Sequence, residues 1–209
     1  MKILILEPYF TGSHKQWALG YKKYSKHEVK ILSMKGQFWK WRMHGGAVYL
    51  AKQVKNKNYK PDLILSTDML DLSTFLALTK TKTRSAIYFH ENQLSYPWSP
   101  NDRDVLKKRD HHYSFINYIS ALSADHVLFN SRFHMEIFLK ELHSFLNHFP
   151  DYNEIDTIKI IEKKSEVLSL AIELKKFDSY KYTNHNKPLI LWNHRWEYDK
   201  NPELFFKSL

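Results

Sequence analysis

The chain has 209 residues, of which 43% are hydrophobic, and it contains no cysteine. This composition is typical of a packed globular protein and argues against disorder. The missing cysteines exclude disulfides and thiolate metal sites from this sequence. No apolar run approaches the roughly 18 residues of a membrane span, and the first apolar run is too short for a signal peptide. We therefore expect a cytoplasmic protein with no transmembrane segment.

The net charge of +10 is concentrated in one part of the chain. Residues 1–60 hold 13 Lys/Arg and 2 Asp/Glu, whereas residues 61–209 hold 19 and 20. A basic region of this kind attracts polyanions such as nucleic acid, anionic lipid or phosphorylated ligands. Surface lysines that only keep the protein soluble are the alternative.

Short apolar runs, rich in Ile, Leu, Val and Phe, alternate along the chain with segments of helical periodicity. Because the runs are continuous rather than alternating, they indicate strands buried on both faces, as in a parallel sheet. Strands alternating with helices predict an α/β fold, a Rossmann-like doubly wound parallel sheet. The runs are Ile3–Leu6, Val29–Leu32, Leu63–Leu65, Ala86–Phe89, Val127–Phe129 and Val167–Leu170.

Two longer helical segments follow the fourth and fifth runs. In residues 104–122, the face that we expect to be buried is formed by Phe115, Ile119 and Leu122. In residues 132–149, it is formed by Phe138, Leu142, Phe145 and Phe149. Ser131 is expected to cap the second helix.

The pattern divides the chain into a long first domain and a short second one. Residues 1–172 contain the predicted strands, and the polar residues 173–187 lack periodicity, which is typical of a linker. Residues 188–209 open with the apolar run Leu189–Trp192, which predicts a strand, and continue into a helix. One strand and one helix cannot bury a core, so we interpret residues 188–209 as the beginning of a second domain.

Polar side chains follow several of the predicted strands. In an open parallel sheet, ligands bind beyond the carboxyl ends of the strands, so these groups are expected to converge on one edge. They are the segments Thr11–His14, Ser66–Asp68, His90–Asn92 and Asn130–Ser131.

His90 ends the run Ala86–Phe89 and is the candidate with the most chemistry, although a strand-end histidine is often only a hydrogen-bonded structural residue. Gly12 follows the first strand, where it either lets the backbone approach a ligand or merely supplies a positive φ. Neither a dinucleotide-binding fingerprint nor a P-loop is present. Adjacent histidines on a helix point about 100° apart, so we reject a zinc site at residues 111 and 112.

Residues 38–46, FWKWRMHGG, interleave aromatic and cationic side chains within the basic region. Aromatic rings can stack on unpaired bases while cations hold phosphates. The same composition suits a membrane interface, or a helix with core tryptophans and solvated cations. Residue types alone leave the three readings open.

Arg195 and Lys200 follow the strand predicted at the start of the second domain. A guanidinium and an ammonium near a helix start suit a diphosphate. Two solvated surface cations are the alternative.

Several strings resemble the tRNA-queuosine alpha-mannosyltransferase family, which is related to the retaining glycosyltransferases of family four with the GT-B fold. The resemblance runs from residue 3 to residue 209, and HENQLSYPWSPNDRD is its most specific string. The others are ILEPYFTGSHKQWALGY, PDLILSTDMLDLSTFLAL, YSFINYISALSADHVLFNSRFHMEIFL, FPDYNE and LILWNHRWEYDKNPELFF.

The resemblance implies two Rossmann-like domains facing a cleft, with the acceptor mainly on the first and the nucleotide sugar mainly on the second. It implies that mannose passes, with retention, from GDP-mannose to the queuosine nucleoside at the wobble position of a tRNA. No cofactor is implied, and the reaction is expected to be metal-independent. The paired glutamates of the family's E-x7-E motif are expected beyond residue 209.

By the same resemblance, His90 lies beside the transferred sugar, and Gly12 and Ser13 approach the donor phosphates. Arg195 and Lys200 stabilise the leaving diphosphate as negative charge builds on it. Asn92 and the basic region are expected to contact the acceptor tRNA. The cations predicted for that contact are Lys22, Lys23, Lys26, Lys40 and Arg42.

Two rival readings remain open at this point. One is a related glycosyltransferase that acts on a membrane lipid, with residues 38–46 facing anionic lipid. The other is a truncated chain that binds the acceptor without catalysis, because most of a donor domain is missing.

Overall fold

The computed structural model describes residues 1–57, 59–107, 112–180, 187 and 189–209. The chain divides into two compact units. The first consists of residues 1–96 and 111–171, and the second of residues 97–110 and 172–209.

The first unit is built on a sheet of six parallel strands in the order β2-β1-β3-β4-β5-β6. All six predicted runs contribute to it, so the predicted α/β, Rossmann-like doubly wound fold is confirmed. The strands are β1 (Lys2–Phe10), β2 (Glu28–Lys35), β3 (Leu63–Thr67), β4 (Arg84–Phe89), β5 (His126–Phe129) and β6 (Ser165–Val167).

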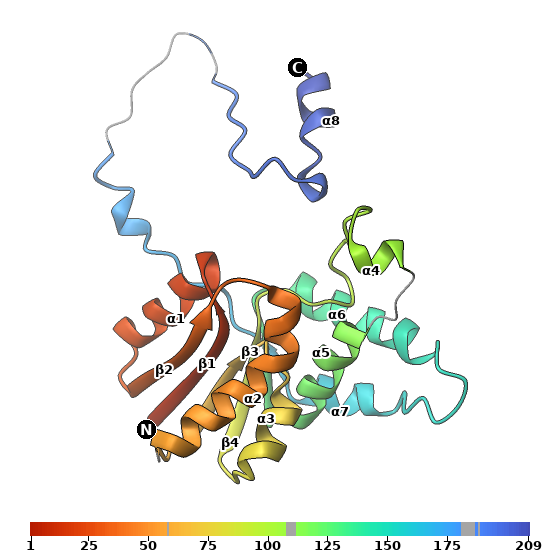
Figure 1. The fold of residues 1–209 in the computed structure, drawn as a ribbon. Coiled ribbons are helices and arrows are strands. Elements are labelled where there is room, and N and C mark those ends of the chain that lie inside the picture. Colours follow the sequence, from red (N-terminus) through yellow and green to blue (C-terminus); the bar gives the residue numbers. More distant parts are fainter. Residues whose placement is uncertain (58, 108–111, 181–186, 188) are drawn as a thin grey trace. The chain divides into compact units, whose positions relative to one another are not determined.

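Helices cover both faces of this sheet (Figure 1). One face packs against α1 through Ala18 and Trp17, and the other against α2, α3, α5, α6 and α7. The two faces explain the continuous apolar run in β1, where alternate residues point into different cores and Ile3–Leu6 are at most 1% exposed. The helices of this unit are α1 (Gly12–Tyr24), α2 (Trp39–Lys57), α3 (Leu72–Thr79), α5 (His112–Ser123), α6 (Arg132–Leu146) and α7 (Thr157–Lys163).

The buried face of α6 agrees largely with the prediction. Phe138 and Leu142 are fully buried, and the hydroxyl of Ser131 accepts a hydrogen bond from the backbone N–H of His134 over 3.1 Å. The predicted cap is therefore confirmed. The helix ends at Leu146, so Phe149 lies outside it and is 40% exposed.

The prediction for the segment before β5 is wrong in two respects. It contains the separate helices α4 (Arg103–Leu106) and α5, with residues 108–111 outside the described part of the chain. In α5, Phe115 is 44% exposed. The buried side chains are instead Tyr113, Ser114, Ile116, Asn117, Tyr118, Ser120 and Ala121. Periodicity that counts only apolar residues misses a helix face that is buried for its hydrogen bonds.

The end of the sheet and the second unit also differ from expectation. β6 ends at Val167, before the predicted run is complete. In the second unit, residues 189–192 form no strand, and Leu189 is 77% exposed. The elements of the second unit are α4, α8 (Pro202–Lys207) and the short 3-10 helices Leu174–Lys176 and Tyr198–Lys200.

Among the residues that the structure describes, no helix combines the length and the apolar character needed to cross a bilayer.

Candidate active site at the carboxyl edge of the sheet

Four polar residues meet at the carboxyl edge of the sheet, where β1 and β3 run next to each other. Connections from these two strands leave in opposite directions, so this is the switch point at which open α/β sheets bind ligands. We call the four residues the edge cluster. They are Glu7 in β1, His14 in the first turn of α1, Asp68 after β3 and His90 after β4.

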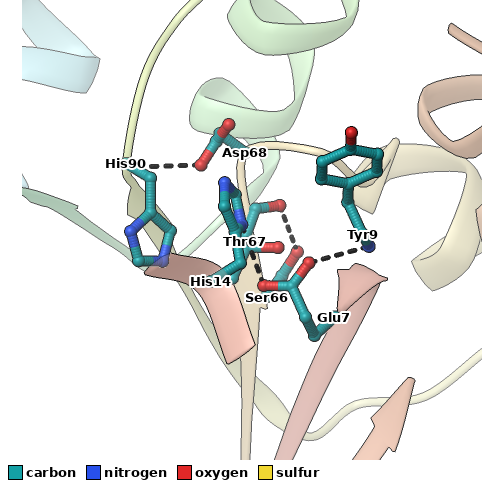
Figure 2. Close-up of polar contacts among 7 residues, drawn as sticks. All are labelled: Glu7, Tyr9, His14, Ser66, Thr67, Asp68 and His90. Carbon is teal, nitrogen blue, oxygen red and sulfur yellow. Dashed lines mark hydrogen bonds and ion pairs between the residues drawn. The ribbon is translucent and has the colours of Figure 1, made fainter. Parts of the chain in front are cut away.

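Glu7 and His14 form the centre of the edge cluster (Figure 2). The Glu7 carboxylate is fully buried and lies 3.1 Å from Nδ1 of His14. Its other oxygen accepts a hydrogen bond from the backbone N–H of Tyr9 over 2.8 Å. A buried carboxylate needs such partners because burial without them is costly, so Glu7 fixes the turn and the His14 ring together.

Asp68 ties His90 to the same group. Its carboxylate is buried and accepts a hydrogen bond from the backbone N–H of His90 over 2.8 Å, as Figure 2 shows. The rings of His90 and His14 pack with their centroids 4.2 Å apart. The backbone turn after β4 thereby holds the His90 ring against His14.

The electrostatics of the edge cluster favour one charged and one neutral histidine. Burial opposes charge on His14, but the hydrogen bond to Glu7 and the charges of Asp68, Glu7 and Glu91 outweigh it and raise the pKa of His14 to about 9. Burial raises the pKa of Asp68 to about 8, although His14 opposes that shift. At neutral pH His14 is therefore an imidazolium next to the Glu7 carboxylate.

His90 has the opposite behaviour. Burial, with the nearby charges of His14 and His134, lowers the pKa of its imidazole to about 3. Both ring nitrogens are buried and have no hydrogen-bond partner among the described residues. A buried polar atom without a partner is rare in proteins and calls for an explanation. The geometry therefore presents a neutral ring that can donate one hydrogen bond and accept another.

The loop after His90 is held by its own side chains and by α5. Asn92 is buried, its side-chain oxygen accepts hydrogen bonds from the backbone N–H groups of Leu94 and Ser95, and its amide donates to the Ser95 hydroxyl. The structure thus gives Asn92 a role within the turn, and its contact with the acceptor stays a prediction. This is the local form of an Asx turn.

Asn117 explains why polar residues of α5 are buried. Its side-chain oxygen accepts from the backbone N–H of Gln93 over 2.7 Å, and its amide donates to the backbone oxygen of Asp68 over 2.9 Å. Asn130, after β5, donates to the backbone oxygen of His90 over 2.8 Å. Asn117 of α5 and Asn130 after β5 therefore fix the two turns that carry Asp68 and His90.

Gly12 and Ser13 open α1 beside the edge cluster. Gly12 has a φ of +49°, which glycine adopts without the cost that other residues carry. The preceding Thr11 makes no side-chain cap to the helix. The positive φ accounts for glycine at this position, and the start of α1 lies at the edge where the prediction places a donor phosphate.

The predicted acceptor cations do not form one surface. Lys22 and Lys23 lie in the last turn of α1, and Lys26 precedes β2, so all three are at the amino edge of the sheet. Lys40 and Arg42 lie in the first turn of α2, at the carboxyl edge and on the other face. The Nε of Arg42 donates to the backbone oxygen of Lys35 over 3.0 Å. The structure places only these last two cations at the same edge as the edge cluster.

Arg195 and Lys200 belong to the second unit. The Nζ of Lys200 lies 2.8 Å from the Asp199 carboxylate. The hydrogen bond from Lys200 lowers the pKa of Asp199, with a smaller contribution from the charge of Arg195. A diphosphate that bound Lys200 would therefore have to compete with Asp199.

A metal is the chemical alternative for the edge cluster. Glu7, His14 and His90 are the described residues whose possible ligand atoms come within 4.8 Å of one another. However, Nδ1 of His14 already bonds to Glu7, and the two imidazoles pack ring against ring. The hydrogen bond between His14 and Glu7 would have to break before Nδ1 of His14 could bind an ion. The arrangement fits an ion pair beside a neutral histidine better than a metal centre.

Comparisons with known proteins identify the family. Residues 2–172 match the family described as tRNA-queuosine alpha-mannosyltransferase N-terminal. The chain belongs to this family. It is also 34% identical over 219 aligned positions to a tRNA-queuosine alpha-mannosyltransferase of Drosophila melanogaster, covering 99% of this chain and 56% of that protein. The chain thus spans about half the length of this relative of the tRNA-queuosine alpha-mannosyltransferase family.

Sequence reasoning selected His90 and missed its neighbours as site residues. His14 and Asp68 stood in the segments expected at the edge, but no role was predicted for them. Glu7 carried the clearest available signal, because a carboxylate directly follows the apolar run of a strand that is buried on both faces.

Proposed function

We propose that the protein carrying this chain transfers mannose from GDP-mannose to the queuosine nucleoside at the wobble position of a tRNA, with retention. The observation that carries the proposal is His90, whose two buried ring nitrogens have no partner among the described residues at the ligand-binding edge of the sheet. Membership of the tRNA-queuosine alpha-mannosyltransferase family supplies the reaction class.

In this proposal His90 binds hydroxyl groups of the transferred mannose. Because its ring is neutral, it acts through hydrogen bonds and adds no positive charge of its own beside the sugar. Asp68 supports it through the backbone of His90, and Glu7 supports it through His14. The edge cluster would thus hold the sugar in a fixed position during transfer.

The leaving group is assigned to Arg195 and Lys200, as the family resemblance implies. The bond between the sugar C1 and the diphosphate oxygen breaks, and its electron pair remains on GDP. Arg195 and Lys200 would stabilise that charge. As a separate part of the proposal, the backbone at Gly12 and Ser13 would approach a donor phosphate. A hydroxyl of the queuosine cyclopentenediol forms the new bond to C1 on the same face, and its proton passes to the departing phosphate. No metal is required in this scheme, so we expect activity in the presence of EDTA.

For the acceptor, the placement of Lys40 and Arg42 at the carboxyl edge favours these two cations as tRNA contacts. Lys22, Lys23 and Lys26 were predicted with them but lie at the opposite edge. Substitutions of these lysines therefore serve as the comparison for substitutions of Lys40 and Arg42. The predicted cytoplasmic location is part of the proposal, because tRNA is its acceptor.

The decisive assay uses the full-length protein, labelled GDP-mannose and tRNA with or without queuosine. The proposal predicts label in queuosine-containing tRNA and none in tRNA that lacks queuosine. Equal labelling of both would exclude queuosine as the acceptor, and transfer from another nucleotide sugar in preference to GDP-mannose would exclude the donor.

The rival acceptor is a membrane lipid, favoured only by the exposed aromatic residues near the start of α2. Transfer of label to lipid extracts instead of tRNA would support it. The other rival, an acceptor-binding chain without catalysis, is tested by assaying residues 1–209 beside the full-length protein. If both bound tRNA equally but only the full-length protein transferred mannose, residues 1–209 would be assigned acceptor binding without catalysis.

A further inference from the structure

The helix α2 combines positive charge with exposed aromatic side chains. It holds five Lys/Arg residues and no Asp/Glu. Trp41, in its first turn, is 63% exposed, and Phe38, directly before the helix, is 76% exposed. An exposed tryptophan on a helix is unusual for a residue of this size, which proteins generally bury, so Trp41 needs an explanation.

The Trp41 ring lies close against the backbone of its own helix. A β-carbon added to Gly45, one turn further along, would come within 2.7 Å of the Cε2 and Cζ2 atoms of Trp41. Real β-carbons do not approach other atoms so closely, so glycine at this position is what allows the ring to rest there. One side of the indole is thereby covered by the helix, and the remaining exposed area is presented to solvent.

This geometry suits a flat aromatic ligand better than a lipid. Aromatic anchors of membrane surfaces insert an apolar face between acyl chains and headgroups, whereas a ring that rests on its own backbone does not project. A base can stack on such a ring, and its phosphates need cations nearby. Arg42 is the next residue, and its Nε is fixed by the backbone oxygen of Lys35. The planar guanidinium leaves further donors for a phosphate.

We propose that Trp41, resting on Gly45, is a stacking platform for an unpaired base of the RNA acceptor, with Arg42 holding an adjoining phosphate. This inference rests on the proposed function, which supplies an RNA with an unpaired anticodon loop. It specifies which surface of the first unit receives that loop. Since stacking accepts any base, it predicts affinity without sequence preference at this position.

Two variants of the full-length protein test the platform. Trp41→Ala removes the ring and is expected to weaken binding of an anticodon stem-loop RNA by about 5- to 100-fold. Gly45→Ala keeps the ring and every charge but displaces the indole from the helix, so binding should weaken in the same direction. The melting temperature of Gly45→Ala should be equal to or higher than that of the wild type, because alanine is the better helix former and the exposed ring can move.

The matched control is Tyr24→Ala. Tyr24 is also 63% exposed and stands beside Lys22 and Lys23, but at the opposite edge of the sheet. The affinity of the Tyr24→Ala variant for the stem-loop should equal that of the wild type. Dissociation constants from fluorescence anisotropy, with melting temperatures for each variant, provide the readout.

Wild-type affinity in Trp41→Ala, or in Gly45→Ala, would overturn the platform. If Trp41→Ala lost binding to phosphatidylglycerol vesicles but bound RNA like the wild type, the platform would be overturned in favour of a membrane contact. Failure of the platform can be told apart from failure of the proposed function, because the platform is tested by RNA affinity. Unchanged affinity in the variants, with mannose transfer intact, refutes the platform alone. RNA binding by the wild type without any transfer refutes the function alone.

Discussion

The carboxyl edge of the sheet carries two polar regions that are built in opposite ways. The edge cluster hides its acidic side chains, with Glu7 and Asp68 at most 1% exposed, and gives each of them a hydrogen-bond partner. The start of α2 exposes the side chain of Trp41 and carries the partly exposed cations Lys40 and Arg42. Buried charges shift pKa values and affect stability, whereas exposed charges contribute little to stability and are screened by salt. The two regions should therefore respond to different perturbations.

The largest effect should come from removing the buried carboxylate. Glu7→Ala leaves His14 and the backbone N–H of Tyr9 without their acceptor. Breaking a buried charged pair in this way typically costs about 3–5 kcal/mol, which should appear as a lower midpoint in urea denaturation.

Glu28→Ala is the control for that variant. Glu28 pairs with Lys30 at 3.8 Å with about half of its side chain exposed, so its loss should change stability by less than about 1 kcal/mol. If the two variants had equal midpoints, the edge cluster would not be the tightly coupled group described above.

The next effect is a pH dependence of stability. The pKa of His14 rises from 6.5 to about 9 on folding, so its stabilising contribution is complete below pH 6.5 and is lost as the pH rises through 9. Asp68 also binds its proton more tightly when folded, with a pKa raised to about 8, and acts in the same direction. The melting temperature should therefore fall between pH 6.5 and pH 9.

Glu7→Gln separates this effect from general alkaline destabilisation. It removes the negative partner of His14, so the fall over the same pH range should become shallower. The groups that face His14 are Glu7, Asp68, Glu91 and His90, and NMR titration of the His14 ring checks the assignment. An ordinary pKa for His14 in the wild type would contradict it.

The smallest effect concerns the partly exposed cations at the start of α2, Lys40 and Arg42. tRNA binding should weaken steeply with salt, and removing Lys40 or Arg42 should reduce the salt slope by about 1 for each phosphate that is no longer neutralised. Lys22→Ala and Lys23→Ala, at the opposite edge, should leave the slope unchanged. Binding that is indifferent to ionic strength would contradict the proposal that Lys40 and Arg42 contact the tRNA.

The same contrast explains what could be predicted from the sequence. Runs such as Ile3–Leu6 predicted the sheet correctly, because continuous apolarity is the direct consequence of burial on both faces. Ser131 indicated the start of α6, because its role depends only on the next three residues. His90 could be selected because its strand delivers it to the edge where ligands bind.

What could not be predicted depends on partners distant in the chain. Asn117 is buried because it bonds to the turns at Gln93 and Asp68, a relation that helix periodicity does not contain. Likewise, the run Leu189–Trp192 has the composition of a strand, yet in the structure it pairs with no other strand among the described residues and Leu189 remains exposed. The spread of the predicted acceptor cations over two edges follows from the direction of α1, which sequence spacing does not show.

The most direct test of the central claim compares the wild-type full-length protein with His90→Ala, using GDP-mannose and queuosine-containing tRNA. We predict that single-turnover transfer falls roughly 100-fold or more, while tRNA affinity is unchanged and His126→Ala, an exposed histidine at the start of β5, keeps the wild-type rate. Transfer by His90→Ala at the wild-type rate would contradict the placement of the sugar at the edge cluster.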